Sequence, residues 1–252
     1  MKILLVDNYE EMSKKAADMI EELLTAKNSA VLGLATGSTP IGTYKELIQR
    51  YEKTGLDFSM VTTFNLDEYI GLGESSKDSY NYFMKSNLFD HINIKNDSTH
   101  VPDGLAKDPV AYGRMYDKMI ENAGGIDLQV LGIGSNGHIA FNEPAEELNL
   151  GTGPVSLSKK TIEDNSRFFE SREKVPTEAV SMGIGSIMRA KKIILLANGE
   201  GKSEAIGQIL NSGVISTWLP ASLLLLHPDV TLICDQEAFS LVDRKTMAGV
   251  LI

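Results

Sequence analysis

The sequence is poor in the residues that build disulfide frameworks and metal sites. It contains one cysteine, Cys234, and four histidines in 252 residues. A single cysteine cannot form an intrachain disulfide and is typical of a reducing compartment, so we expect a cytoplasmic protein. Because Cys234 lies inside the apolar run Val230–Cys234, it is expected to be a buried core residue rather than a reactive thiol.

Long hydrophobic runs and an excess of positive charge are also missing. No stretch approaches the ~18 apolar residues of a membrane span, and the apolar run at the N-terminus is too short for a signal peptide. The formal net charge of −10 argues against a nucleic-acid-binding face. Neither membranes nor nucleic acids are therefore expected as partners. An anionic small molecule is still compatible, because local cations can hold one within a negative field.

What the sequence does contain is an alternation of apolar, β-prone runs with helical ones. Strands buried on both faces and separated by helices predict an α/β fold, a doubly wound, mostly parallel, Rossmann-like sheet with helices on both faces. The expected strands are Ile3–Val6, Ala30–Ala35, Val61–Asn65, Leu128–Gly132, Ile193–Ala197 and Val230–Cys234. One helix is expected where apolar residues from Met12 to Leu24 form a stripe at helical spacing. The other expected helices are Pro40–Tyr51, Ser79–Leu88, Val110–Asn122, Ala179–Ala190 and Lys202–Leu210.

The chain shows no internal division. It has no repeat, low-complexity tract or linker, so residues 1–252 are expected to form a single domain. The stretch 143–176 is long and poorly periodic for a compact domain, which is typical of a lid or a binding loop. In sheets of the expected kind, ligands bind beyond the carboxyl ends of the strands. The polar residues that follow the predicted strands are therefore the candidates for a functional site.

Two glycine-rich segments resemble nucleotide-binding motifs but lack their context. Gly132–Gly137 matches the dinucleotide fingerprint, yet Pro144 would break the helix that should follow, and no strand ending in an acidic residue follows at the required distance. Gly199–Ser203 resembles the end of a P-loop whose first glycine would fall at Leu196. No nucleotide or other cofactor is therefore expected. Lys202 still lies at a helix start that favours an anion, with a solvated loop lysine as the alternative.

A third strand end is rich in hydrogen-bond donors. Thr36, Gly37 and Ser38 follow the second predicted strand, and Pro40 is well placed as the first helical residue. Gly37 would let the backbone come close to a ligand. Ser38 and Thr39 could equally form a simple helix N-cap. On the residues alone, an anion site and a capping turn both remain open.

Carboxylates and one histidine supply acid–base candidates. Asp67 and Glu68 follow the strand Val61–Asn65, where partial burial would raise a carboxyl pKa and make a better base. Since adjacent strand residues point to opposite faces, only one of the two is expected to face a site; an ordinary surface turn is the alternative. His138 follows the glycine-rich strand end, and the carboxylate of Glu143 could orient its imidazole. The other histidines lack ligand spacing, so no metal is expected.

At these positions the sequence resembles the glucosamine-6-phosphate deaminase (glucosamine-6-phosphate isomerase) family, over nearly the whole chain. Leu34–Pro40 resembles the family's phosphate loop, Phe64–Tyr69 its enolisation motif and Gly132–Pro144 its ring-opening motif. Asn165–Phe169 and Gly201–Lys202 resemble the segments that supply the family's phosphate-binding cations.

The resemblance implies an enzyme that converts glucosamine 6-phosphate and water into fructose 6-phosphate and ammonia, without a redox change or a metal. It implies that His138, oriented by Glu143, moves the proton that opens the sugar ring. Asp67 would then take the C2 proton and help to return a proton at C1. Fixing the remote phosphate would position C1 and C2 against these groups. The residues implied to hold the phosphate are Thr36, Gly37, Ser38, Arg167 and Lys202.

The chain departs from the family pattern at two places. Asn136 stands where many members have aspartate, although shorter bacterial members resemble this chain; asparagine can hydrogen-bond to an imidazolium but cannot stabilise it by charge. The stretch Ala145–Val155 has no lysine or arginine and contains Glu146 and Glu147, so it lacks the basic residues with which hexameric members bind their activator, N-acetylglucosamine 6-phosphate. A monomer or small homo-oligomer without this activation is expected, unless Lys159–Lys160 supply the missing charges.

Three alternative functions stay open. Galactosamine 6-phosphate differs from the expected substrate only at C4, so a changed pocket wall would suffice to accept it. The related 6-phosphogluconolactonases share the implied fold but lack the combination of Asp67 with His138 and Glu143. Sugar-phosphate sensor domains of transcription regulators also resemble this fold, but such a regulator should carry a basic helix-turn-helix segment. This sequence opens with the strand Ile3–Val6 instead.

Overall fold

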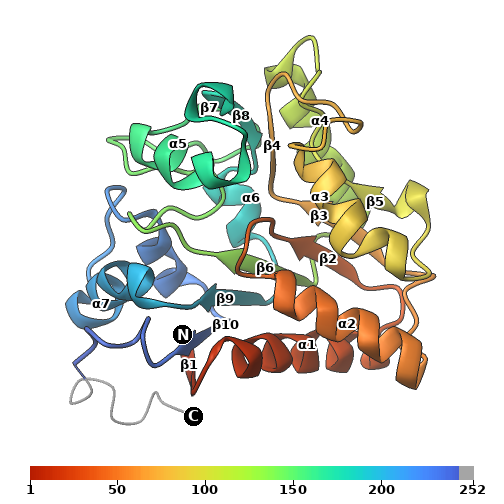
Figure 1. Ribbon diagram of the computed structural model, residues 1–252, viewed down its shortest axis with the longest axis horizontal. Coiled ribbons are helices and arrows are strands. Elements are labelled where there is room, and N and C mark those ends of the chain that lie inside the picture. The colour runs from red at the N-terminus through yellow and green to blue at the C-terminus, as the bar shows by residue number, and fades with distance from the viewer. Residues whose placement is uncertain (244–252) are drawn as a thin grey trace.

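The centre of the molecule is a seven-stranded parallel sheet (Figure 1). The computed structural model describes residues 1–243. The strands lie in the order β1-β10-β9-β6-β2-β3-β5, and every neighbouring pair is parallel. They are β1 (Lys2–Val6), β2 (Val31–Leu34), β3 (Thr62–Asn65), β5 (Thr99–His100), β6 (Leu128–Gly132), β9 (Ile193–Ala197) and β10 (Val230–Asp235).

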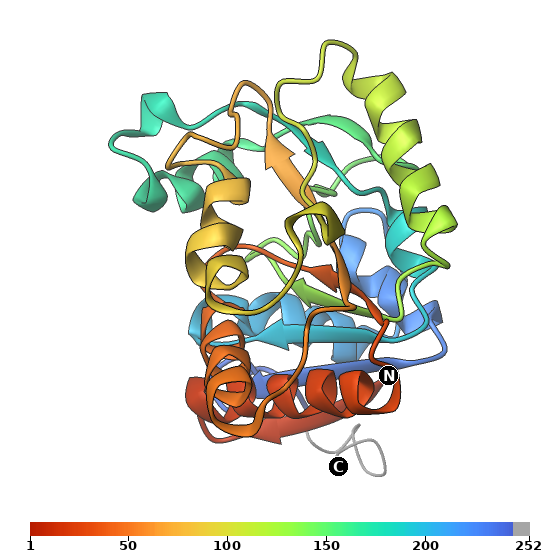
Figure 2. The ribbon, with the colours of Figure 1, turned by 90° about the vertical axis from the view of Figure 1, so that its right-hand side faces the viewer.

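Helices cover both faces of this sheet, which confirms the predicted doubly wound fold (Figures 1 and 2). The helices are α1 (Tyr9–Ala26), α2 (Ile41–Thr54), α3 (Tyr80–Asn87), α4 (Pro109–Asn122), α5 (Lys159–Asn165), α6 (Ile184–Met188) and α7 (Ser203–Ser212). Ile193 and Leu195 of β9 pack with α4, α6 and α7, whereas Ile194 and Leu196 pack with α1, α2 and α3 on the opposite face. Short 3-10 helices are η1 (Phe89–His91), η2 (Asn96–Ser98), η3 (Ser166–Phe168), η4 (Arg172–Lys174), η5 (Glu200–Lys202) and η6 (Pro220–Leu226).

Side-chain caps fix where several helices begin. The Asn8 side chain accepts a hydrogen bond from the backbone N–H of Glu11 at the start of α1. Asp108 does the same for the N–H of Ala111 in α4, whose first residue is Pro109. Each cap satisfies a backbone donor that has no partner within the helix, and proline at the first position has no donor to satisfy.

A second, antiparallel sheet lies above the parallel one in Figure 1, in the order β4-β8-β7. Its strands are β4 (Asp67–Tyr69), β8 (Glu178–Ser181) and β7 (Gly153–Ser156). The prediction of a helix over Ala179–Ala190 is wrong for its first part, because residues 178–181 form β8 and only Ile184–Met188 are helical. Val180 pairs with β4 on one side and β7 on the other, and this tertiary pairing overrides the local helical pattern.

The poorly periodic stretch of the sequence proves to be built from short elements. Residues 157–177 join β7 to β8 and contain α5, η3 and η4. The two ends of this connection meet where the N–H of Leu157 donates to the carbonyl of Thr177 at 2.8 Å. The connection therefore leaves the small sheet and returns to the same place, as the tip of a long hairpin.

The structure bears on the predictions for Cys234 and for membrane spans. Cys234 is fully buried in β10, and burial raises the pKa of its thiol to about 12, which confirms a core residue. Across residues 1–243, the structure contains no helix that combines the length and the apolar character needed to cross a membrane.

Candidate functional site

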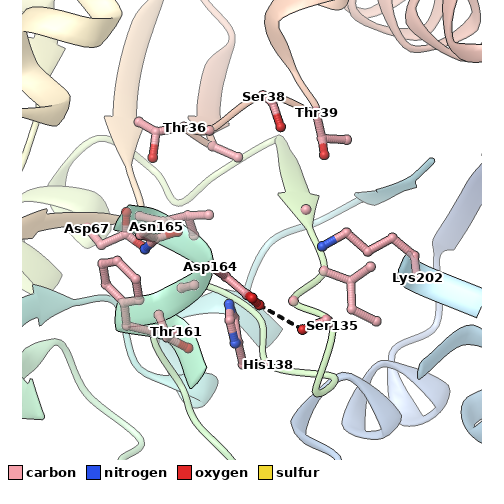
Figure 3. A pocket seen from close by; sticks show the side chains of 18 of the residues that line it. Thr36, Ser38, Thr39, Asp67, Ser135, His138, Thr161, Asp164, Asn165 and Lys202 are labelled. Atoms are coloured by element: carbon pink, nitrogen blue, oxygen red, sulfur yellow. Dashed lines mark hydrogen bonds between the residues drawn. The ribbon is translucent and has the colours of Figure 1, made fainter. Parts of the chain in front are cut away.

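A cavity of about 450 Å³ opens at the carboxyl edge of the parallel sheet. Its walls come from the loops after β2, β3, β6 and β9 and from residues 161–167 of the β7–β8 connection (Figure 3). β2 and β6 are neighbours, with β3 and β5 outside β2 and with β9 and β10 outside β6, so the strand order reverses between them. Such a switch point is where α/β sheets bind ligands. Of the predicted site residues, those lining the cavity are Thr36, Gly37, Ser38, Asp67, His138, Arg167 and Lys202.

The loop after β2 faces the cavity instead of capping the helix that follows. The N-cap position of α2 is Pro40, and neither Ser38 nor Thr39 makes a capping hydrogen bond. The capping interpretation of this turn is therefore wrong. Gly37 has φ +88, a conformation that disfavours any side chain, and the Tyr9 hydroxyl donates to the carbonyl of Ser38 at 3.0 Å. The Tyr9 hydroxyl also accepts from the backbone N–H of Gly42 at 2.8 Å in the first turn of α2. The positive end of the helix dipole lies beside the cavity.

Positive charge gathers at one end of the cavity. Arg167 Nη2 donates to Ser38 Oγ at 3.4 Å, and Lys202 extends into the cavity from the start of α7 (Figure 3). Burial lowers the pKa of Lys202, the charge of Asp164 opposes this, and Arg167 and Lys160 lower it further. Several cations are thus close enough to influence one ammonium. Together with the donors of the β2 loop, they form a site suited to a phosphate monoester.

Asp67 and Glu68 take different roles although they are adjacent. Asp67 lines the cavity and is buried, and burial, followed by the nearby charge of Glu68, raises its pKa to about 8. Glu68 points away and accepts hydrogen bonds from the backbone N–H groups of Tyr69, Tyr80 and Asn81 at 2.9–3.0 Å. It therefore caps the start of α3. The expectation that only one of the two acids faces the site is confirmed.

His138 is held from behind by two polar side chains. Its Nδ1 lies 2.7 Å from Asn136 Oδ1 and 3.5 Å from Glu143 Oε2, and Asn136 Nδ2 donates to Glu143 Oε2 at 2.9 Å. Because Nδ1 faces two acceptor oxygens, this nitrogen carries the proton and Nε2 is left as the acceptor. Burial would raise the pKa of Glu143, but hydrogen bonding with His138, the positive charge of this ring when it is protonated, and hydrogen bonds with Thr161 and Asn136 lower that pKa to about 2.

The glycines of the segment after β6 seat this histidine. A Cβ atom on Gly134 would lie 2.3 Å from Cε1 of His138, so the ring can pack here only against bare backbone. Gly137 has φ +83, and Ala140 also adopts a left-handed conformation, with φ 51. No helix follows β6 before β7. The resemblance to a dinucleotide motif thus reflects a tight turn that supports an imidazole, in agreement with the interpretation from Pro144.

Sequence reasoning missed several residues of the cavity wall. Tyr80 lines the cavity from the start of α3, and its hydroxyl lies 3.1 Å from that of Tyr69. Asp164 lies within the α5 segment, three residues before Arg167, a spacing that places both on one side of a helical turn and could have indicated it. The other lining residues not singled out include Thr39, Ser135, Thr161, Asn165 and Asn198. Among residues 1–243, no group of three or more His, Cys, Asp or Glu side chains could hold a metal ion.

Comparison with known proteins agrees with this arrangement. Residues 7–233 match the model of a family described as glucosamine-6-phosphate isomerases/6-phosphogluconolactonase. This chain belongs to that family. The match includes every residue that lines the cavity; of the strands, only β1 and the end of β10 lie outside it.

Within the glucosamine-6-phosphate isomerase/6-phosphogluconolactonase family, relatives that are 53–57% identical to this chain are named glucosamine-6-phosphate deaminase. The glucosamine-6-phosphate deaminase of Thermoanaerobacter pseudethanolicus is 55% identical over 247 residues, covering 98% of this chain and 97% of the relative. That of Clostridium tetani is 57% identical over 238 residues, covering 94% and 98%. A solved structure described as a monomeric glucosamine-6-phosphate deaminase is 44% identical, with a TM-score of 0.93 over 96% of this chain and 100% of that one.

The lactonase side of the family is more distant. A 6-phosphogluconolactonase from Trypanosoma cruzi superposes with a TM-score of 0.75 over 95% of this chain and 96% of its own, at 21% identity. This likeness shows a shared fold and nothing more. The deaminase relatives are therefore the informative ones for function.

Proposed function

We propose that this enzyme is a glucosamine-6-phosphate deaminase, which converts α-D-glucosamine 6-phosphate and water into fructose 6-phosphate and ammonia. One observation carries the proposal. A buried carboxylate, Asp67, and a hydrogen-bonded imidazole, His138, face the same cavity, and Arg167 and Lys202 supply cations at its other end. The names of the relatives at 53–57% identity agree with this reading.

The first step opens the sugar ring. His138 Nε2 takes the proton of the C1 hydroxyl and returns it to the ring oxygen, while the bond between C1 and that oxygen breaks and C1 becomes a carbonyl. Asn136 and Glu143 hold the imidazole at Nδ1, and Glu143 stabilises the imidazolium that forms in between. In this chain the neutral Asn136 aligns the ring by hydrogen bonding, and the negative charge comes from Glu143.

The second step moves protons between C2, C1 and the amino group. Asp67 takes the C2 proton and an ammonium proton passes to the C1 oxygen, which gives an enolamine. Return of the proton from Asp67 to C1 produces an iminium at C2. Water then adds to C2, the C–N bond breaks, and ammonia leaves as ammonium. Burial suits Asp67 to this exchange, because a carboxyl pKa near the working pH lets it both take and return a proton.

The phosphate end positions the reacting carbons. Thr36, Gly37, Ser38, Arg167 and Lys202 would hold the 6-phosphate, so that the sugar extends from there toward Asp67 and His138. Binding energy from this unreactive group then supports the chemistry at C1 and C2. We also propose that residues 143–176 act as a lid, since Thr161, Asn165 and Arg167 of this stretch line the cavity.

Ammonia release tests the proposed function directly. Purified protein is incubated with glucosamine 6-phosphate, and ammonium and fructose 6-phosphate are measured together; equal amounts of both are expected. Galactosamine 6-phosphate and 6-phosphogluconolactone serve as comparison substrates. Faster turnover of either of these would replace the proposed substrate. Turnover of none of the three would leave a sensor without catalysis as the better reading.

The pKa of Asp67 predicts the pH dependence of the reaction. Only the ionised carboxylate can accept the C2 proton, so kcat/KM should rise with a slope of about one as the pH increases toward 8 and level off above it. Glu143, with a pKa of about 2, stays ionised throughout this range and adds no further limb. The profile is measured with the substrate's own ammonium titrated separately. A profile that is flat from pH 6 to 8.5 after this correction would contradict the assignment.

The segment after Glu143 predicts simple kinetics. Glu146 and Glu147 are exposed there, and no lysine or arginine lies within residues 145–155. A coupling of even ~1 kcal/mol requires contacts that differ between two states, and a phosphate dianion would meet only negative charge here. We therefore expect a hyperbolic rate curve that N-acetylglucosamine 6-phosphate does not change, and a monomer or small oligomer in solution. A sigmoidal curve made hyperbolic by this compound would point to Lys159 and Lys160 as its ligands.

The cysteine content of the chain bears on the cellular compartment. We propose a cytoplasmic enzyme, because its one cysteine is a buried core residue and no disulfide is available to the chain. The proposed substrate, a phosphorylated amino sugar, is an intracellular kind of metabolite. Fractionation of the source cells, followed by the deaminase assay, would test this.

A further inference from the structure

One carboxylate lies among the cations of the proposed phosphate site. Asp164 projects from α5 into the cavity that Arg167 and Lys202 also line (Figure 3). Its Oδ2 accepts a hydrogen bond of 2.8 Å from Ser135 Oγ. Ser135 belongs to the loop after β6, which also lines the cavity. The contact therefore ties α5 to the loop after a strand of the parallel sheet.

The charge of Asp164 acts on the same cations that a phosphate would use. It raises the pKa of Lys202 against the lowering by burial, whereas Arg167 and Lys160 lower that pKa. Asp164 thus offsets part of the positive charge at this end of the cavity. A phosphate dianion arriving at Lys202 and Arg167 would enter the cavity that Asp164 also lines and would be repelled by its negative charge.

We propose that Asp164 is an internal counter-anion of the phosphate site, held in place by Ser135 and opposed to the phosphate of substrate and product alike. The inference rests on the proposed function, which supplies the phosphate. Asp164 is exposed and needs no part in proton transfer, for which the buried Asp67 and the half-buried His138 are at hand. Its role is to set affinity.

The consequence for turnover follows from where the opposition acts. Substrate and product carry the same 6-phosphate, so a charge that opposes this group weakens both to a similar extent. Uniform weakening raises KM and leaves the chemical step unchanged. It also speeds the departure of fructose 6-phosphate, and release of product limits many enzymes. Asp164 therefore lowers the affinity for the sugar phosphate and speeds the release of the product.

Isosteric removal of the charge tests this. Asp164→Asn keeps an oxygen that can accept from Ser135 but removes the negative charge. We expect its dissociation constant for inorganic phosphate, measured by calorimetry, to fall about two- to fivefold relative to the wild type, with KM and the inhibition constant of fructose 6-phosphate falling in parallel. The value of kcat should not rise. The difference between the two proteins should shrink as ionic strength increases.

Three further variants separate charge from packing. Asp164→Ala should also bind phosphate more tightly, while Asp164→Glu, which keeps the charge, should stay close to the wild type. Glu163→Gln is the matched control: it removes a carboxylate from the neighbouring position of α5, where Glu163 pairs with Arg172 at 3.0 Å and does not line the cavity. Its affinity for phosphate is expected to be unchanged. Circular dichroism checks that each variant is folded.

The outcomes distinguish this inference from the proposed function. If Asp164→Asn and Asp164→Ala bind phosphate no more tightly than the wild type, or more weakly, the inference is overturned, even when the wild type deaminates glucosamine 6-phosphate. If the wild type releases no ammonia, the proposed function fails, and the phosphate titrations still report on Asp164 because they need no turnover.

Discussion

Replacing Asp67 by asparagine should reduce kcat by about 10²–10⁴-fold, the usual effect of losing a general base, and leave KM within a few-fold of the wild type. Asparagine has the same shape but cannot accept the C2 proton. The direct measurement is exchange of the C2 proton with deuterated solvent, which should fall as far as ammonia release does. Asp90→Asn, at an exposed position far from the cavity, is the control and should be unaffected. Exchange at the wild-type rate in Asp67→Asn would remove Asp67 from this role.

The same substitution should make the protein more stable at high pH. The pKa of Asp67 is raised from 3.8 to about 8 in the folded protein, so the unfolded chain releases this proton at lower pH than the folded one. Its contribution to stability is therefore present below about pH 4 and is lost as the pH rises toward 8. Asparagine does not titrate. The Tm of Asp67→Asn minus that of the wild type should grow from pH 5 to pH 8, which also excludes unfolding as the cause of lost activity.

Loss of Lys202 should act on binding more than on chemistry. Truncating one partner of a charge-assisted contact in a partly buried site typically costs 2–5 kcal/mol, so Lys202→Ala is expected to raise KM by roughly 30-fold or more. Arg167→Ala should have a smaller effect, because the side chain of Arg167 is more exposed and water screens its charge. Initial rates over a wide range of glucosamine 6-phosphate measure both.

The substrate can be truncated instead of the enzyme. Unphosphorylated glucosamine should be a poor substrate for the wild type, and the substitution Lys202→Ala should matter little for it, because the phosphate that Lys202 is proposed to hold is missing. Lys118→Ala removes a surface lysine that pairs with Glu121 and serves as the control for charge. Equal efficiency of the wild type on glucosamine and its 6-phosphate would show that the cations hold something else.

The parallel sheet could be predicted because its strands are buried on both faces and are therefore apolar along their length. Ile193–Ala197 is apolar at every position, and β9 has the same bounds. The small sheet could not, since β4 consists of Asp67, Glu68 and Tyr69, whose extended conformation depends on pairing with β8. The extended conformation of β8 also depends on pairing, with β4 and β7. These strands are distant in sequence, so the residues of β8 alone do not predict it.

The site shows a similar division. Residues that end a strand or begin a helix could be placed from the sequence, as Lys202 was, because the parallel topology brings all such ends to one edge. The direction in which each side chain points could not be predicted. Glu68 looks as suitable as Asp67 in the sequence, and only the position of α3 makes it a cap. The contact between Asp164 and Ser135 joins two connections whose approach no motif records.

The proposed catalytic and phosphate-binding groups come from both sheets. His138 and Lys202 follow strands of the parallel sheet, whereas Asp67 opens β4 and Arg167 lies in the hairpin between β7 and β8 of the small one. Leu66 joins them, since its N–H donates to Leu34 and its carbonyl accepts from Met182. A bound sugar phosphate would touch groups of both sheets at once, and so works as a cross-link. Occupancy should therefore slow amide hydrogen exchange along the seam, even at residues that the ligand does not contact.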